Sequence, residues 1–288
     1  MEQQKSELYA SHPAMSERDF SLLRGFIKEE CGINISPSKK VMLTLRLQKR
    51  LRALSLDSFR QYIELITTPV GRSREIVSML NVVSTNKTDF FREPSHFDYL
   101  NKEVLPRLME AKGAGGKVNI WSAGCSSGEE PYTIAMVMSE FAERNPGLRF
   151  GITASDISMN VLRKAVGAVY PDAAAENIPA LFRRKYMLRG TGPKKGFHRV
   201  APELRDKVEF RRLNLMDADY GFKKPLHIIF CRNVVIYFDR ETQAELFHKF
   251  FRLLYPGGYL FLGHSETLEE KYTGFFRAAS TVYRAGDV

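Results

Sequence analysis

Residues 121–131, Trp-Ser-Ala-Gly-Cys-Ser-Ser-Gly-Glu-Glu-Pro, decide the fold that we expect for this chain. The stretch follows an apolar run at 118–121 and precedes a helical pattern. Gly124 and Gly128 allow the backbone to approach a ligand closely because they lack a side chain, and Pro131 suits a first helical turn. A turn of this kind between a strand and a helix is where a doubly wound α/β fold binds a nucleotide-like cofactor. A plain tight turn is the alternative interpretation.

The chemistry of the same stretch narrows the class of cofactor. Its spacing is not the Gly-x-Gly-x-x-Gly pattern of dinucleotide-binding folds, and the chain has no Gly-Lys-Ser/Thr sequence, which excludes a P-loop. Glu129 and Glu130 at the start of the helix would repel a pyrophosphate, because both are acidic. They suit a cofactor with a positive centre, such as S-adenosylmethionine, which carries a sulfonium and an ammonium and no phosphate.

Short apolar runs alternate with helical patterns on both sides of this turn. The runs at 149–153, 208–210, 226–230 and 258–262 are predicted strands, and a final strand is expected at 280–284. Such alternation predicts βαβ units and an open parallel sheet. The rhythm breaks between Pro171 and Val208, where Arg189-Gly-Thr-Gly-Pro193 is a turn signal. We expect an inserted hairpin or short antiparallel sheet there.

The first 85 residues have a helical pattern. Ser16 and Asp19 form a helix start signal, and Gly32 is a plausible stop. Further helices are expected at 38–54, 56–66 and 72–83. No acidic residue occurs from Lys39 to Leu56, so the second helix is predicted to carry uncompensated cations: Lys39, Lys40, Arg46, Lys49, Arg50 and Arg52. A solvated helix face and a docking surface for acidic helices both fit this pattern.

Composition excludes several classes of protein. The 288 residues are 44% hydrophobic and 26% charged, which is typical of one large or two modest globular domains and excludes disorder. No apolar run approaches 18 residues, and residues 1–15 are polar, so we expect neither a membrane span nor a secretory signal. The three cysteines lie far apart and the six histidines are scattered, which predicts a reducing cytoplasm and no metal. The net charge of +10 predicts an acidic partner, although a basic surface that binds nothing is the alternative.

Polar residues near the predicted strand ends are the candidate ligands of a cofactor. Asp156 ends the strand after the glycine-rich turn, where an acid accepts hydrogen bonds from ribose hydroxyls, or else caps the next helix. Asn86, Thr88 and Arg92 lie where the helical region joins the sheet region, a common ligand position. Further candidates follow two later strands: Asn214, Leu215, Arg232, Asn233 and Tyr237. Phe90, Phe91 and Phe97 fit the core better than they fit cofactor stacking.

Four segments in this order resemble the chemotaxis receptor methyltransferase family, CheR. They are Thr-Asn-x-Thr-x-Phe-Phe-Arg-Glu at 85–93, Trp-Ser-Ala-Gly-x-Ser-x-Gly-Glu-Glu-Pro-Tyr at 121–132, Ala-Ser-Asp-Ile at 154–157 and Phe-Cys-Arg-Asn-Val-x-Ile-Tyr-Phe at 230–238. The resemblance implies a class I S-adenosylmethionine-dependent methyltransferase with an α/β doubly wound sheet, a small all-helical N-terminal domain and an inserted small antiparallel β-subdomain. The domains implied are a tail at 1–14, the helical domain at 15–85, a linker at 86–100 carrying part of the cofactor site, and the methyltransferase domain at 101–288 with its β-subdomain at 171–208.

The resemblance also implies a reaction and the residues for it. The reaction is transfer of a methyl group to glutamate γ-carboxylates on the cytoplasmic helices of chemoreceptors, with Arg92 and Tyr237 next to the transferring methyl. The residues implied to bind the cofactor are Asn86, Thr88, Arg92, Ala123, Glu129, Asp156, Asn214, Leu215, Arg232 and Asn233. The basic helix, through Lys39, Arg46, Lys49 and Arg50, would meet the acidic receptor region. Arg189, Gly190 and Gly192 would dock a receptor tail peptide.

Partners and location follow from the same resemblance. We expect a cytoplasmic monomer that is recruited to membrane-bound receptor arrays, without nucleic acid, bound metal or membrane insertion. A nucleic-acid methyltransferase would share the fold and use the positive charge, but the chain lacks the Asn/Asp-Pro-Pro-Tyr/Phe segment of amino-methylating DNA enzymes. A receptor-binding module that keeps the cofactor without turnover is a further alternative, against which the presence of Arg92 and Tyr237 argues.

Overall fold

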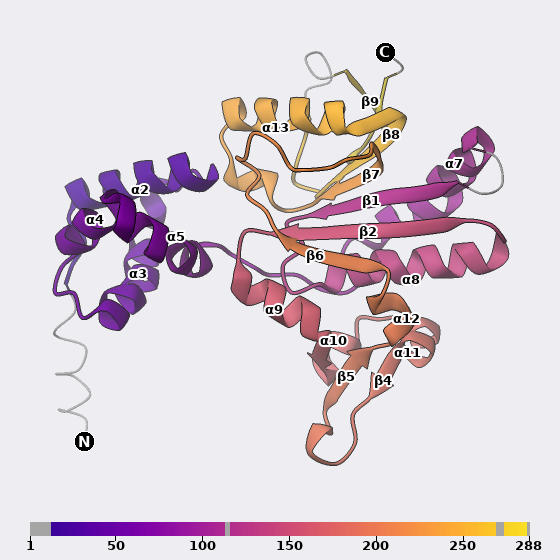
Figure 1. The fold of residues 1–288 in the computed structure, drawn as a ribbon, viewed down its shortest axis with the longest axis horizontal. Helices are drawn as coiled ribbons and strands as arrows, with labels where there is room; N and C mark the ends of the chain where they lie inside the picture. Colours follow the sequence, from indigo (N-terminus) through magenta and orange to yellow (C-terminus); the bar gives the residue numbers. More distant parts are fainter. Residues whose placement is uncertain (1–12, 113–115, 269–273, 287–288) are drawn as a thin grey trace. The chain divides into compact units, whose positions relative to one another are not determined.

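The computed structural model describes residues 13–112, 116–268 and 274–286 (Figure 1). The chain divides into two compact units, with the boundary between Thr85 and Asn86. The stretch expected as a linker, 86–100, lies wholly in the second unit and carries helix α6 (Pro94–Tyr99). Most of the expected tail at 1–14 lies outside the described residues. None of the helices described combines the length and apolar character needed to cross a bilayer.

The part of the first unit that the structure describes, residues 13–85, is all helical. Its elements are α2 (Glu17–Cys31), the 3-10 turn η1 (Pro37–Lys39), α3 (Lys40–Leu54), α4 (Phe59–Thr67) and α5 (Pro69–Val83). The hydroxyl of Ser16 accepts a hydrogen bond from the amide of Asp19 at 3.0 Å, so the predicted start of α2 is confirmed. Gly32 ends the helix in the left-handed conformation with φ 76°, as predicted.

Two helices of this unit begin away from their predicted positions. The amide of Gln61 donates to the hydroxyl of Ser58, so α4 begins at Phe59 rather than Leu56. The amide of Gly71 donates to the hydroxyl of Thr68, and Pro69 occupies the first turn of α5, which therefore begins before Arg72. In both helices a capping hydroxyl fixes the start, and the apolar periodicity alone did not locate it.

The core of the first unit is built from helix faces with apolar residues at helical spacing. Leu43, Leu47 and Leu51 of α3 are buried, as are Leu23 and Ile27 of α2. Residues four apart stack on one face of a helix. The apolar stripe predicted for the second helix is therefore the face that packs into the core.

The second unit holds a seven-stranded sheet with the strand order β6-β2-β1-β7-β8-β10-β9. Its strands are β1 (Lys117–Ala123), β2 (Arg149–Asp156), β6 (Val208–Arg212), β7 (Leu226–Cys231), β8 (Leu254–Leu262), β9 (Phe275–Ala279) and β10 (Val282–Ala285). The first five named are parallel to one another, whereas β10 pairs antiparallel with both β8 and β9. The predicted open α/β sheet is confirmed, with an antiparallel pair added at one end.

Helices follow β1, β2 and β7 of the large sheet. They are α8 (Glu129–Arg144), α9 (Met159–Gly167), the 3-10 turn η4 (Val235–Tyr237) and α13 (Arg240–Leu253). Before β1 the chain forms α6, a π-helical turn η2 (Leu100–Val104) and α7 (Leu105–Lys112), a helical stretch that the sequence pattern did not predict. Phe90 and Phe97 belong to the core beside β1 and α8, which confirms their predicted core role.

A small antiparallel sheet interrupts the second unit between α9 and β6. It contains β3 (Val169–Pro171), β5 (Phe197–Val200) and β4 (Met187–Arg189) in the order β3-β5-β4. Short helices α10 (Asp172–Ala175), α11 (Ala180–Tyr186) and α12 (Pro202–Arg205) and the turn η3 (Gly192–Lys194) complete it. Figure 1 shows this sheet beside α11 and α12, away from the β8–β10 end of the large sheet. The predicted insertion is thus a three-stranded subdomain.

All three cysteines are free and buried. Cys31 ends α2 in the first unit, Cys125 follows β1, and Cys231 ends β7. Burial raises the pKa of Cys31 to about 11, and it raises the pKa of both other thiols well above the ordinary range. The thiols are therefore protonated at neutral pH and protected from solvent.

Candidate functional site

The residues predicted to bind a cofactor gather where parallel strands of the large sheet end. β1 ends at Ala123, β2 at Asp156, β6 at Arg212 and β7 at Cys231. In an open α/β sheet the ligand crevice lies outside the carboxyl ends of the strands, at the point where the strand order reverses. That point lies here between β1 and β7. The topology therefore brings residues from four strand ends to one edge.

Hydrogen bonds fix the glycine-rich loop after β1. The amide of Gly124 donates to the carbonyl of Ser155 at 2.8 Å, and the hydroxyl of Ser126 donates to the carbonyl of Asn86 at 2.9 Å. Gly124 has a φ of 79°, and a Cβ there would lie 2.4 Å from Val234. Only glycine fits this position. The loop is thus joined to β2, to the segment that begins at Asn86 and to the loop after β7.

Asp156 is buried at the end of β2, and both of its oxygens accept backbone hydrogen bonds. The amide of Ser126 donates to one oxygen and the amide of Ser158 to the other, each at 2.9 Å. Burial raises the pKa of this carboxyl despite those bonds. A carboxylate has about four acceptor positions, so two backbone amides leave it able to accept hydroxyl hydrogens as well. The N-cap of α9 is Ser158, so the alternative role of Asp156 as the cap of this helix is wrong, and its ribose contact stays a prediction.

Glu129, the first residue of α8, is a buried acid for which the structure describes no ion pair. The hydroxyl of Ser127 donates to its two oxygens at 3.0 and 2.8 Å. Burial raises the pKa of the carboxyl, and the nearby charge of Asp89 raises it further. A buried carboxylate served mainly by one hydroxyl retains capacity for a charged donor.

The segment 86–93 runs alongside this loop without regular structure. Arg92 is half-buried as a residue, and its guanidinium donates to the carbonyl of Lys87 at 3.1 Å. The amide of Phe91 donates to the hydroxyl of Thr133 on α8 at 3.2 Å. Thr88 is half-buried on the same segment. The Phe91 contact holds the segment that carries the predicted catalytic Arg92 against α8.

Arg232, directly after β7, is buried between two acids. Its guanidinium donates twice to Glu93, at 3.0 and 3.3 Å, once to Glu130 at 3.4 Å and once to the carbonyl of Arg92. It lies over the ring of Phe97 at 5.4 Å. A guanidinium has five N–H donors, and these contacts use four of them. Arg232 therefore fixes the main chain at Arg92 and keeps one donor for another acceptor.

The loop after Arg232 is held by a second buried acid, Glu266. The amide of Asn233 donates to Glu266 at 2.8 Å, and the side-chain amide of Asn233 donates to Glu93 at 3.4 Å. Asn233 has a φ of 58°, which is uncommon for a residue other than glycine. Tyr237 ends the turn η4 and is half-buried.

Asn214 and Leu215 form a turn after β6. The side-chain oxygen of Asn214 accepts from the amide of Met216 at 3.1 Å, and the carbonyl of Leu215 accepts from the hydroxyl of Tyr220 at 2.7 Å. Leu215 is buried. The structure places this pair beyond the end of β6, which neighbours β2 in the sheet.

Two family models match the chain and together cover nearly all of it. "CheR methyltransferase, all-alpha domain" matches residues 18–84, and "CheR methyltransferase, SAM binding domain" matches residues 86–284. The chain belongs to the CheR methyltransferase family. Its second unit is the S-adenosylmethionine-binding domain of that family.

Curated relatives agree over most of the chain. A chemotaxis protein methyltransferase of Borreliella burgdorferi is 39% identical, covering 88% of this chain and 89% of the relative. One of Escherichia coli is 38% identical, covering 94% and 91%. Chemotaxis protein methyltransferase 2 of Pseudomonas aeruginosa is 40% identical, covering 87% of each chain.

The side chains at the strand ends fit the cofactor of the CheR family. Glu129 supplies a buried carboxylate with free acceptor positions for an ammonium, and Asp156 supplies one for ribose hydroxyls. S-adenosylmethionine has no phosphate that acidic side chains would repel, and both of these side chains are acidic. The carboxyls are buried, so their attraction to a positively charged ligand is weakly screened by solvent.

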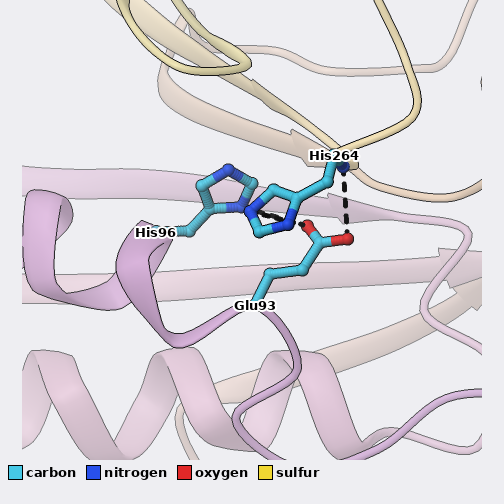
Figure 2. Close-up of side chains that lie close together, drawn as sticks. All are labelled: Glu93, His96 and His264. Atoms are coloured by element: carbon cyan, nitrogen blue, oxygen red, sulfur yellow. Dashed lines mark hydrogen bonds and ion pairs between the residues drawn. The ribbon is translucent and has the colours of Figure 1, made fainter.

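A second group of side chains at this edge resembles a metal site. Among the described residues, Glu93, His96 and His264 place their ligand atoms within 4.8 Å of one another (Figure 2). However, Glu93 already accepts hydrogen bonds from Arg232, from Asn233 and from the amide of His264. A cation would have to displace the guanidinium. Burial, joined by the charge of Arg232, lowers the pKa of His96 to about 4.

The basic face predicted on α3 is only partly free. Arg50 is paired with the buried Glu75 of α5 at 2.7 Å, and Lys40 is paired with Glu17 of α2 at the same distance. The expectation that these two cations are uncompensated is wrong, because their partners come from other helices and are invisible in the α3 sequence. The guanidinium of Arg46 donates to the carbonyls of Val83 and Ser84 and to the hydroxyl of Thr85.

The predicted tail-docking loop is a turn between β4 and β5. The amide of Gly190 donates to the carbonyl of Phe197 at 2.8 Å, and a Cβ at Gly190 would lie 2.0 Å from the carbonyl oxygen of Lys194. Gly192 has a φ of 53° and open space around it. The turn itself therefore explains Gly190, while Arg189 and Gly192 are available for contacts.

Sequence reasoning named Glu130 only as one of two acids at the start of a helix, and it did not single out Glu93 or Glu266. All three are buried or half-buried acids beside Arg232 or Asn233. Glu93 and Glu130 lay inside the quoted segments. Glu266 lies four residues beyond the end of β8. The rule that parallel strand ends meet at one edge could have found it.

Proposed function

We propose that this CheR-family protein transfers a methyl group from S-adenosylmethionine to glutamate γ-carboxylates on the cytoplasmic helices of chemoreceptors, as part of sensory adaptation. The observation that carries the proposal is the row of acids and polar residues at the ends of β1, β2 and β7, on a chain whose relatives are chemotaxis protein methyltransferases.

The cofactor would be held by residues from each strand end. Glu129 meets its ammonium and Asp156 its ribose, while Arg92 and Arg232 are the cations available to its carboxylate. Asn214 and Leu215 lie at the adenine end, and Asn86, Thr88, Ala123 and Asn233 complete the set. When bound, the cofactor supplies an activated methyl group on a sulfonium.

The acceptor needs no general base. A glutamate side chain has an ordinary pKa near 4.3, so it is an anion at neutral pH. The protein must align the acceptor oxygen with the methyl group and exclude water. Tyr237 orients the acceptor carboxylate by a hydrogen bond. Arg92 shapes the site, because a tight ion pair with the acceptor would stabilise the nucleophile and slow its attack.

Docking of the substrate involves the all-helical first unit and the three-stranded subdomain. Lys39, Arg46, Lys49 and Arg50 of the basic helix face an acidic receptor segment. Arg189, Gly190 and Gly192 bind a receptor tail peptide. The protein acts as a monomer recruited to receptor arrays.

The test is methyl transfer from methyl-labelled S-adenosylmethionine to a chemoreceptor cytoplasmic fragment, followed by mild base. Label released as methanol supports a carboxyl methyl ester. Base-stable label would indicate a nitrogen or alkyl-oxygen acceptor, and label in added DNA or RNA would indicate a nucleic-acid methyltransferase. The variant Tyr237→Phe should lower kcat while the dissociation constant of S-adenosylhomocysteine is unchanged.

A further inference from the structure

Glu266 is a buried carboxylate whose hydrogen-bond partners are main-chain amides. The acid is 3% exposed. It accepts from the amides of Gly263 at 2.6 Å, Asn233 at 2.8 Å and Ile236 at 3.1 Å. No ion pair to it is found in the described ranges. Hydrogen bonds from N–H groups to a carboxylate are about twice as strong as those between neutral groups, and here they replace a counter-ion.

These amides belong to two loops that are far apart in the sequence. Gly263 follows β8, whereas Asn233 and Ile236 belong to the loop after β7. A Cβ at Gly263 would lie 2.4 Å from the side-chain nitrogen of Asn233 and 2.9 Å from Glu266. The two loops therefore approach so closely that only glycine fits, and Glu266 joins them.

The loop held by Glu266 carries two residues of the proposed site. Asn233, at its start, is in the left-handed conformation, which asparagine adopts more readily than most residues that have a side chain. Tyr237, at its end, closes the turn η4. Glu266 binds the amide of the first and the amide directly before the second. Two N–H groups of this loop are therefore bound to one carboxylate, which holds the conformation of the loop between Asn233 and Tyr237.

A glutamine at this position would not reproduce the arrangement. Its side-chain nitrogen is a donor, so it would face main-chain N–H groups that are also donors. One oxygen would remain to accept, and at least one buried amide would lose its partner. The conformation of the loop therefore requires a carboxylate at position 266, and an amide cannot replace it.

We infer that Glu266 is a positioning residue for methyl transfer: it sets the conformation of the Asn233–Tyr237 loop without touching the reacting atoms. The inference rests on the proposed function, because that proposal assigns Asn233 to the cofactor and Tyr237 to the acceptor.

The test compares Glu266→Gln with Glu140→Gln in the full-length protein. Glu140 lies on α8 about 16 Å along the helix from Glu129, and it also accepts hydrogen bonds from two side chains, Lys185 and Tyr186. We expect Glu266→Gln to lower kcat and weaken S-adenosylhomocysteine binding by calorimetry, each roughly ten- to hundredfold. Glu140→Gln should leave both unchanged at a similar melting temperature.

A double-mutant cycle separates positioning from general loosening. If Glu266 acts through the loop that carries Tyr237, then Glu266→Gln should lower kcat much less in the Tyr237→Phe protein than in the wild type. If the two substitutions instead lower kcat by independent factors that multiply in the double variant, the inference is overturned. A folded Glu266→Gln protein with wild-type kinetics and binding would also overturn it. Should Glu266→Gln not fold, Glu266→Asp keeps the charge on a shorter stem. Wild-type kcat and affinity in that variant would equally overturn it.

The two proposals fail differently. Binding of S-adenosylhomocysteine requires no methyl acceptor, so a loss of binding in Glu266→Gln supports the positioning role even where chemoreceptor fragments accept no label. If the wild type methylates receptors and Glu266→Gln matches it in every readout, only the positioning role is lost.

Discussion

The carboxylate of Glu93 and the guanidinium of Arg232 lie 3.0 Å apart, although 139 residues separate them in the chain. Arg232 also binds the carbonyl of Arg92, so this ion pair joins the irregular segment 86–93 to the end of β7. Burial alone would raise the pKa of Glu93. Because the charge of Arg232 and the amide of His264 oppose burial, that pKa is lowered.

Replacing Glu93 by glutamine should weaken both the fold and the site. Arg232 would keep Glu130, its more distant carboxylate at 3.4 Å. We expect unfolding of the second unit to become easier by about 2 kcal/mol, since hydrogen bonds to charged groups contribute roughly that much. Calorimetric affinity for S-adenosylmethionine should fall about tenfold, which corresponds to 1.4 kcal/mol. The control is Glu103→Gln, which removes only a surface pair with Arg107. Unchanged affinity in Glu93→Gln would contradict the prediction.

His96 should make the stability of the second unit depend on pH. Its pKa is lowered to about 4 in the folded protein, mainly by burial, against about 6.5 when unfolded. The unfolded chain therefore binds more protons between these values, so stability is complete above pH 6.5 and falls as the pH drops toward 4. The loss is up to about 3 kcal/mol.

The measurement for His96 is denaturant unfolding followed by fluorescence. Trp121 is the single tryptophan of the chain and is buried in β1, so it reports on the second unit. His96→Phe should show a shallower dependence between pH 6.5 and 4. Equal slopes in the two proteins would rule out His96 as the source.

Binding of the cofactor should weaken in acid through Glu129. Burial raises the pKa of this carboxyl, and an ammonium binds its anion, so affinity should fall as the pH drops through that raised pKa. Glu129→Gln should weaken S-adenosylmethionine and S-adenosylhomocysteine alike, about tenfold, since both carry the amine, and should flatten the pH profile. Glu143→Gln, which removes an exposed acid of the same helix, is the control. Equal affinity in Glu129→Gln would refute the assignment.

Lys49 and Arg50 are neighbours on α3 that should respond differently to alanine. Arg50→Ala leaves the buried Glu75 without its guanidinium and should lower the stability of the first unit by about 2 kcal/mol by calorimetry. Lys49 is exposed, so Lys49→Ala should leave stability unchanged. It should raise the KM for the receptor fragment up to about fivefold, as expected for one surface charge pair. A stability loss in Lys49→Ala, or none in Arg50→Ala, would contradict this division.

Local pattern predicted the large elements well. The runs at 149–153 and 226–230 lie inside β2 and β7, and the turn at 121–131 connects β1 to α8. Period and turn chemistry are properties of neighbouring residues, so one sequence suffices for them. The order of the motifs also predicted Arg92, Asp156 and Arg232 as candidate ligands of the cofactor without any knowledge of contacts.

Long-range pairs could not be predicted in this way. The partner of Arg50 lies 25 residues away on another helix, and that of Arg232 lies 139 residues away. Which side chains meet depends on strand order and on helix packing, and neither is encoded in local periodicity. The basic character of α3 was therefore visible, whereas its neutralisation by Glu75 and Glu17 was not.

The three shielded thiols give the chain internal reporters of opening. Cys31 belongs to one unit, while Cys125 and Cys231 belong to the other. A thiol reagent therefore labels each site only after the surrounding structure opens. Mass spectrometry of the labelled peptides would time the opening of the two units separately in one sample. Addition of S-adenosylhomocysteine should slow labelling at Cys125 and Cys231, because a ligand that binds only the folded state suppresses opening, and should leave the rate at Cys31 as it was.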